Sequence, residues 1–111
     1  MTYRRWDIVL VPFPFTNLST NKKRPALVIS PADYNKGPDV IIMFITSNLR
    51  VFGRPGDYKL TKWKEAGLPK PSMSRMKLAT VDKNIVIKKI ARLEETDREA
   101  VQEIITDFFS D

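Results

Sequence analysis

Cysteine and histidine are both absent from the 111 residues of this sequence. The lack of cysteine excludes disulfides and thiolate metal sites, and it is typical of proteins from a reducing compartment. The lack of histidine removes the most common zinc ligand and the most common general base near neutral pH. Any catalysis must therefore use carboxylates, hydroxyls, lysine or arginine, and we expect neither a metal nor a cofactor.

Long apolar runs are also missing. No run approaches the roughly 20 residues that a membrane-spanning helix needs. The N-terminal residues "MTYRRWD" lack the apolar segment of a signal peptide. We therefore expect a cytoplasmic protein with no membrane partner. The length suits a single domain over residues 1–111, which is large enough to bury a core without disulfides.

Acidic residues are scarce outside the C-terminal segment. Residues 94–111 hold seven of the 13 acidic residues and one of the 19 basic ones, so the net charge is −6 there and +12 over residues 1–93. A body this basic suggests a polyanionic partner, most simply a nucleic acid. A charged surface that serves only solubility explains the composition equally well.

Short apolar runs predict a sheet that is buried on both faces. The apolar residues of 40–47 ("VIIMFITS") alternate between the two faces of a strand. A small sheet buries both faces only if it curls into a barrel whose outside is covered by a helix or a second subunit. We expect strands at residues 7–13, 24–30, 40–47, 57–60, 72–82 and 85–93, a helical turn near 32–36 and irregular chain at 61–71.

The C-terminal segment predicts a helix. Thr96 is a candidate N-cap, and Glu99 three residues later would complete a capping box. Strands followed by one helix predict a mainly-β fold, a small curled β-barrel with a C-terminal helix. Apolar residues recur at helical spacing, as expected for a helix that covers the core, at Ala100, Val101, Ile104, Ile105, Phe108 and Phe109.

A single-stranded RNA partner would need a basic groove with exposed aromatic side chains on which bases can stack. Each aromatic residue taken alone is more often part of a core than a stacking platform. The aromatic candidates are Phe13, Phe15, Phe52 and Trp63, and the loops supply the cations Lys22, Lys23, Arg24, Arg50, Arg54, Lys62, Lys64, Lys70, Arg75 and Lys77.

Cleavage of RNA without a metal needs a group that stabilises the charge on the reacting phosphate. Arginine suits this role because its planar guanidinium matches phosphate oxygens, and a hydroxyl beside it can donate a further hydrogen bond. Arg24 begins one expected strand, and Thr46 and Ser47 end the next. If these strands are antiparallel neighbours, Arg24 and Thr46 meet at one barrel rim. Simple capping of a turn is the alternative role for both hydroxyls.

Five motifs occur together in order: "DIVLVPFPFTN", "KKRPALVIS", "VIIMFITS", "KLATVDK" and a final helix. In this the sequence resembles the PemK/MazF family of toxins from type II toxin–antitoxin systems. The resemblance implies an SH3-like barrel that works as a homodimer. It also implies metal-independent, sequence-specific cleavage of single-stranded RNA, chiefly messenger RNA, which leaves a 2′,3′-cyclic phosphate and a 5′-hydroxyl. A cognate antitoxin would block the site with an acidic segment, and DNA would be contacted only through the antitoxin complex.

The resemblance also implies site residues. Arg24 and Thr46 match catalytic positions, while Ser47 and Arg75 are possible catalytic or phosphate-binding residues. The loop at residues 13–23 matches one that gates access of RNA and antitoxin. Thr80 and Asp82 match a stretch that we take as structural. The expected RNA-binding residues are Lys22, Lys23, Asn17, Ser19, Arg50 and Lys77.

The sequence departs from the family pattern at two positions. Trp6 replaces a glycine that usually precedes the first-strand aspartate, where it can pack at the barrel base, narrow access or alter the dimer surface. Lys77 stands where some members have an acid two residues after the arginine that Arg75 matches. A carboxylate base from that position is therefore absent. Because arginine stays protonated in proteins, we assign Arg24 to charge stabilisation and leave the general base unassigned.

Two other functions fit a small basic barrel. One is a CcdB-type toxin that poisons gyrase, but that family relies on a C-terminal Trp-Gly-Ile and this chain ends "DFFSD". The other is a non-catalytic RNA-binding barrel, which needs the same basic groove and no chemistry. Salt-sensitive RNA binding without a cleaved product would distinguish the latter from a nuclease.

Overall fold

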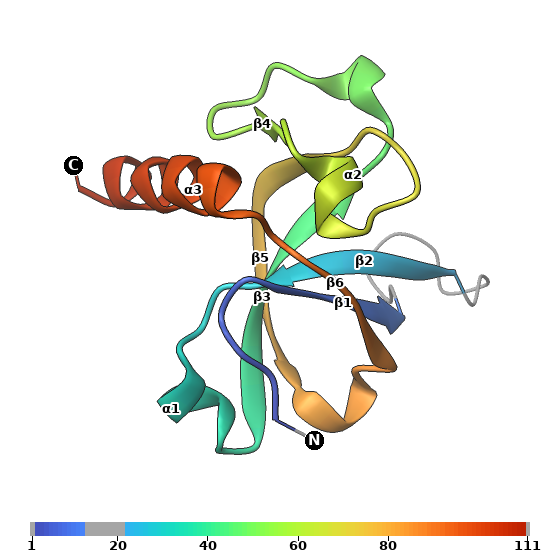
Figure 1. The fold of residues 1–111 in the computed structure, drawn as a ribbon. Coiled ribbons are helices and arrows are strands. Elements are labelled where there is room, and N and C mark those ends of the chain that lie inside the picture. The colour runs from blue at the N-terminus through green and yellow to red at the C-terminus, as the bar shows by residue number, and fades with distance from the viewer. Residues whose placement is uncertain (1, 13–21, 111) are drawn as a thin grey trace.

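The structure is a computed structural model that describes residues 2–12 and 22–110. Within these residues one antiparallel sheet has the strand order β4-β5-β3-β2-β1-β6, and it twists so strongly that β1 and β2 cross the direction of β3 and β5 (Figure 1). The strands are β1 (Asp7–Pro12), β2 (Lys23–Val28), β3 (Asp39–Thr46), β4 (Tyr58–Lys59), β5 (Met73–Asp82) and β6 (Lys88–Arg92). The helices are α1 (Ala32–Asn35), α2 (Trp63–Ala66) and α3 (Glu95–Phe108), with 3₁₀ turns η1 (Leu49–Val51) and η2 (Lys83–Ile85).

The predicted mainly-β fold with a C-terminal helix is confirmed, and two element predictions change. The strand expected at 85–93 begins only at Lys88, because the Asp82 carboxylate accepts the Asn84 N–H at 2.8 Å and closes η2. The segment expected to be irregular contains α2. Gly67, at φ 107°, ends this short helix in the left-handed conformation that glycine adopts most easily.

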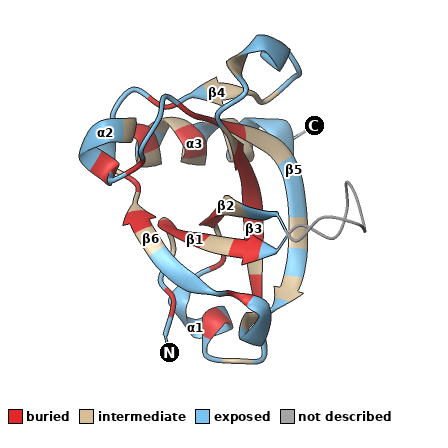
Figure 2. Ribbon diagram, turned by 90° about the vertical axis from the view of Figure 1, so that its right-hand side faces the viewer, coloured by how far each residue is buried: buried red, intermediate tan, exposed pale blue. Residues whose placement is uncertain are grey.

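Buried residues gather on β1, β2 and β3, in the middle of the sheet (Figure 2). The predicted alternation along β3 is confirmed. Val40 and Ile42 belong to one apolar cluster, and Met43 and Ile45 belong to the other. Ile8 and Leu27, from β1 and β2, join the second cluster. A shift in register between Met43 and Ile45 leaves three residues of β5, 75–77, opposite one residue of β3, and this bulge bends β5 there.

The helix α3 covers the second cluster over only part of its length. Val101 is fully buried in that cluster and Ile105 packs against it, as the apolar spacing predicted. Phe108 and Phe109 are 45% and 62% exposed, so the prediction that they cover the core is wrong. Their turn extends past the edge of the sheet (Figure 1), and their rings pack edge to face with each other at 5.1 Å.

The predicted capping box of α3 is also wrong. The helix begins at Glu95, so Thr96 lies inside it, and no side chain caps its N-terminus. Asp97 in the first turn is buried instead. Its carboxylate accepts hydrogen bonds from the Tyr58 hydroxyl at 2.6 Å, from the N–H and the hydroxyl of Thr61, and from the Lys62 N–H. A tertiary contact therefore anchors this helix end, where a negative charge also suits the helix dipole.

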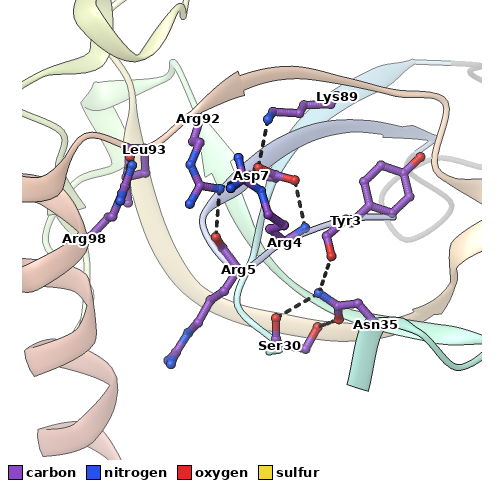
Figure 3. A network of polar contacts seen from close by, with 10 residues as sticks. All are labelled: Tyr3, Arg4, Arg5, Asp7, Ser30, Asn35, Lys89, Arg92, Leu93 and Arg98. Atoms are coloured by element: carbon purple, nitrogen blue, oxygen red, sulfur yellow. Dashed lines mark hydrogen bonds and ion pairs between the residues drawn. The ribbon is translucent and has the colours of Figure 1, made fainter. Parts of the chain in front are cut away.

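A polar network ties the start of the chain to the base of the sheet (Figure 3). The Asp7 carboxylate accepts the Arg4 N–H at 2.9 Å and pairs with Arg92 at 2.7 Å and Lys89 at 3.1 Å. Burial opposes the charge on Asp7, but these donors together hold the pKa of its carboxyl below the usual value. Asn35 extends the network by donating to the carbonyls of Tyr3 and Ser30.

Trp6 has a φ of 78°, a left-handed conformation that is rare for residues other than glycine. Its N–H donates to the Val28 carbonyl and its carbonyl accepts from the Leu93 N–H, so two long-range hydrogen bonds hold it there. The ring packs at the base against the second apolar cluster, and the Arg5 guanidinium lies 4.7 Å from its centroid. The glycine that the resemblance led us to expect would adopt this φ without strain.

No helix in the described part of the chain is long and apolar enough to cross a membrane.

Candidate functional site

A cavity of about 300 Å³ opens at the rim where β2 begins and β3 ends. Its described lining residues include four cationic side chains and no carboxylate. A hollow lined in this way attracts anions, because like charges placed close together raise the local positive potential. The residues that line it are Arg24, Phe44, Ile45, Thr46, Asn48, Val51, Arg54, Arg75 and Lys77.

The pairing of β2 with β3 brings Arg24 and Thr46 to the same end of the two strands. Ala26 pairs with Phe44 at one end of the antiparallel ladder, and Arg24 and Thr46 each lie two residues beyond that pair. Both residues line the cavity. The structure therefore brings these two predicted residues into one cleft, while their chemical roles stay predictions.

Thr46 also caps the turn that follows β3. Its Oγ1 accepts the Asn48 N–H at 3.1 Å, which is the alternative role considered for this hydroxyl. A hydroxyl that accepts one hydrogen bond still has its own hydrogen to donate, so turn capping and donation into the cavity are compatible. Ser47 is exposed and is not among the residues that line the cavity.

Arg75 is held at the cavity by Asp57. Its Nε donates to Asp57 Oδ1 at 2.9 Å, and its Nη2 donates to Asp57 Oδ2 and to the Val51 carbonyl, both at 2.7 Å. The Asp57 side chain is only 1% exposed. The hydrogen bond from Arg75 lowers the pKa of Asp57 to about 2, and Asp57 in turn raises the pKa of Arg75. Both groups are therefore charged at any pH at which the protein works.

Sequence reasoning missed Asp57. It was assigned to a short expected strand and given no role in the site. One signal was available, because Asp57 is the only acidic residue between Asp39 and Glu65, in a segment rich in lysine and arginine. An isolated carboxylate in a basic segment has a strong electrostatic reason to pair with one of the cations.

Lys77 lines the cavity at the position where the resemblance would allow an acid. Its ammonium lies 5.2 Å from the centroid of the Phe44 ring, which is 7% exposed at the cavity floor. A cation above an aromatic face is stabilised by the ring's negative face. This position therefore adds positive charge to the site.

The other expected RNA-binding residues lie at different distances from the cavity. Lys22 and Lys23 are exposed at the start of β2, next to Arg24, and Arg50 is exposed in η1 without lining the cavity. Asn17 and Ser19 lie outside the described residues, as does nearly all of the expected gating loop, at 13–21.

The aromatic candidates for base stacking differ in how far they are exposed. Phe52 is 46% exposed beside the cavity residue Val51, and the Lys59 ammonium lies 4.5 Å from its ring centroid. Trp63 packs against the second apolar cluster, so it belongs to the core rather than to an exposed platform. Phe13 and Phe15 lie outside the described residues.

The described ranges 2–12 and 22–110 contain no group of three or more aspartate, glutamate, histidine or cysteine side chains that could hold a metal ion.

Solved structures of MazF toxins have the same fold as this curled sheet. MazF from Deinococcus radiodurans is 21% identical with a TM-score of 0.76, and the match covers 100% of this chain and 99% of that one. The Mycobacterium tuberculosis toxin MazF-mt6 is 20% identical with a TM-score of 0.74, over 94% of this chain and 96% of that one. An endoribonuclease in complex with its cognate antitoxin, from a mycobacterial species, is 11% identical with a TM-score of 0.74, over 96% and 91%.

The sequence itself identifies the family. No curated protein matches it. The family model of the PemK-like, MazF-like toxins of type II toxin–antitoxin systems matches residues 4–109. The chain belongs to this family, as the motifs of the sequence indicated.

Proposed function

We propose that this toxin is an endoribonuclease that cleaves single-stranded RNA, chiefly messenger RNA, at short sequences and without a metal. The observation that carries the proposal is that Arg24 and Thr46 line the same cavity, to which four cations contribute. Mycobacterial endoribonucleases with the same fold support it. A cationic cavity suits a substrate with one negative charge per nucleotide.

The proposed reaction is an internal transesterification. The 2′-hydroxyl loses its proton and attacks the adjacent phosphorus, the bond from phosphorus to the 5′-oxygen breaks, and this oxygen takes up a proton. The products are a 2′,3′-cyclic phosphate and a 5′-hydroxyl. Arg24 stabilises the charge that develops on the phosphate oxygens, and Thr46 donates a hydrogen bond to one of them.

Arg75 and Lys77 bind phosphates rather than move protons in this proposal. Asp57 holds the Arg75 guanidinium in place, and the positive charge of Lys77 replaces the acid that some family members have there. Lys22, Lys23 and Arg50 extend the cationic surface along the RNA, with Asn17, Ser19 and Ser47 as further contacts. No carboxylate lines the described part of the cavity, so we assign none of these residues as the general base.

The proposed partners follow from the same charges. We propose that the protein acts in the cytoplasm as a homodimer, and that a cognate antitoxin inhibits it by laying an acidic segment into the cationic cavity. A mycobacterial relative has been solved with its cognate antitoxin. Contact with DNA would occur only through the antitoxin complex.

The test is to incubate the purified protein with a mixed RNA pool in EDTA and to map the new 5′ ends. We expect discrete cleavage sites whose 5′ ends must be phosphorylated before ligation. RNA that binds in a salt-sensitive manner but stays intact would favour the non-catalytic barrel. Inhibition of gyrase with RNA left intact would favour a gyrase poison.

A further inference from the structure

The Asp57 carboxylate is the centre of a compact cluster beside the cavity. Its Oδ2 accepts the N–H groups of Gly53 and Arg54 at 3.1 and 2.9 Å, and the two oxygens each accept one hydrogen bond from Arg75. The Asp57 N–H donates back to the Arg54 carbonyl at 3.0 Å and closes the turn. Asp57 therefore joins two separate parts of the chain, the turn at 53–57 and the strand β5.

The turn at 53–57 and the strand β5, which Asp57 joins, each contribute one cationic side chain to the lining of the cavity. Arg54 comes from the turn and Arg75 from β5, and both line the cavity with Arg24 and Thr46. Asp57 itself does not line it. Two parallel hydrogen bonds to a carboxylate fix the plane of the Arg75 guanidinium as well as its position, which a single hydrogen bond cannot do. The Val51 carbonyl accepts a further hydrogen bond from the same guanidinium.

We propose that Asp57 is a positioning residue of the cleavage site, which holds the Arg75 guanidinium and the main chain of Arg54 in place at the cavity that receives RNA phosphates. This inference rests on the endoribonuclease activity proposed above. An arginine that is already ordered loses less conformational freedom when it binds a phosphate, so RNA binds in the reactive geometry more often. Asp57 contributes through these two arginines and does not touch the RNA.

If the ion pair between Asp57 and Arg75 served only to stabilise the fold, its removal would have a different effect. Its removal would lower the free energy of unfolding, and it would leave the kinetics of the folded protein unchanged. Asp7 serves as the matched control, because its side chain is 2% exposed against 1% for Asp57 and it also pairs with an arginine, at the base of the sheet and away from the cavity.

The experiment compares RNA cleavage by the wild type and by Asp57→Asn, Asp7→Asn, Arg75→Ala and the double variant Asp57→Asn/Arg75→Ala, at a temperature where circular dichroism shows each to be folded. We expect Asp57→Asn to lower kcat/KM by about 10²-fold, since small displacements of positioning groups cost that much. In the Arg75→Ala background the same change should cost less than about fivefold, because its main partner is gone. Asp7→Asn should stay within about twofold of the wild type.

If Asp57→Asn does not fold, Arg75→Lys tests the positioning role by changing the other partner of the ion pair. Lysine keeps the positive charge but cannot hold the carboxylate through two parallel nitrogens, so we expect kcat/KM to fall at least about tenfold. Wild-type kcat/KM in Asp57→Asn, or in Arg75→Lys if only that variant folds, would overturn the positioning role. An equal loss from Asp57→Asn in both the wild-type and the Arg75→Ala backgrounds would also overturn it.

A binding measurement separates this inference from the proposed activity. Fluorescence anisotropy with a 2′-O-methyl RNA pool, which cannot be cleaved, should show about tenfold weaker binding by Asp57→Asn than by the wild type. A wild type that binds this pool but cleaves no RNA would overturn the proposed activity and leave the role of Asp57 to be judged on binding. A wild type that neither binds nor cleaves would overturn both.

Discussion

Two buried carboxylates, Asp7 at the base of the sheet and Asp57 at its rim, are used in opposite ways. Asp7 pairs with both Arg92 and Lys89, so at the base one carboxylate of β1 holds two cations of β6 (Figure 3). Asp57 pairs with Arg75 next to a cavity that four cations line. The pair at the base therefore holds two strands together, while the pair at the rim fixes one of the cations that line an open cavity.

Removing positive charge at the rim should have the largest effect on function. We expect Arg24→Ala to lower kcat/KM for RNA cleavage by at least about 10²-fold, or about 3 kcal/mol, because a charge-stabilising contact is lost in the transition state. Cleavage of the mapped RNA site in EDTA measures this. The matched control is Lys36→Ala, which removes an exposed cation next to α1, near the start of β3 and so at the end of that strand away from the cavity, and should change the rate little. Wild-type cleavage by Arg24→Ala would contradict the assignment.

Removing negative charge at the base should affect stability and not function. We expect Asp7→Asn to lower the free energy of unfolding by about 2 kcal/mol, since it weakens the hydrogen bonds of Arg92 and Lys89. These cations are 27% and 40% exposed, so water compensates part of the loss. Urea denaturation measures the change. A loss of RNA cleavage by folded Asp7→Asn would show that the base and the rim are not independent.

Phe52, beside the cavity, can be used to test whether aromatic stacking strengthens RNA binding beyond the effect of charge. We expect Phe52→Ala to weaken binding of single-stranded RNA by about 1 kcal/mol, because an exposed ring can stack on a base. Tyr34→Ala is the control, since it removes a similarly exposed ring from α1. Fluorescence anisotropy at two salt concentrations measures both. An equal effect of the two substitutions would argue against a platform at Phe52.

Lowering the pH should weaken the contacts of the carboxylates at both the base and the rim, and with them the stability of the fold. Asp57 has a pKa of about 2 in the folded protein, and the pKa values of Asp7 and Asp97 are also lowered. A carboxyl group whose pKa is lower in the folded state stabilises the fold above its unfolded pKa, near 4, and this contribution is lost as the pH falls toward the folded value. Melting temperatures should therefore decline between about pH 4 and pH 2. Asp57→Asn should show a shallower decline, and an unchanged slope would contradict the paired state of Asp57.

Much of this fold could be predicted because its signals are local. The apolar runs of β1, β2 and β3 and the helical spacing of α3 follow from side-chain periodicity within single segments. Antiparallel neighbours were enough to place Arg24 near Thr46, because the start of one strand then meets the end of the next. Helix ends were harder, since the start of α3 depends on how Asp97 is held by a distant loop.

The sequence by itself determined the strands, the helix, the family and the excess of positive charge, because each depends on residues close together along the chain or on composition. Only the tertiary structure decided which carboxylate meets Arg75, why α3 begins at Glu95 and how Trp6 comes to be held at a φ of 78°. These contacts join residues far apart in sequence. Their partners are chosen by how the sheet curls and packs, which no local pattern encodes.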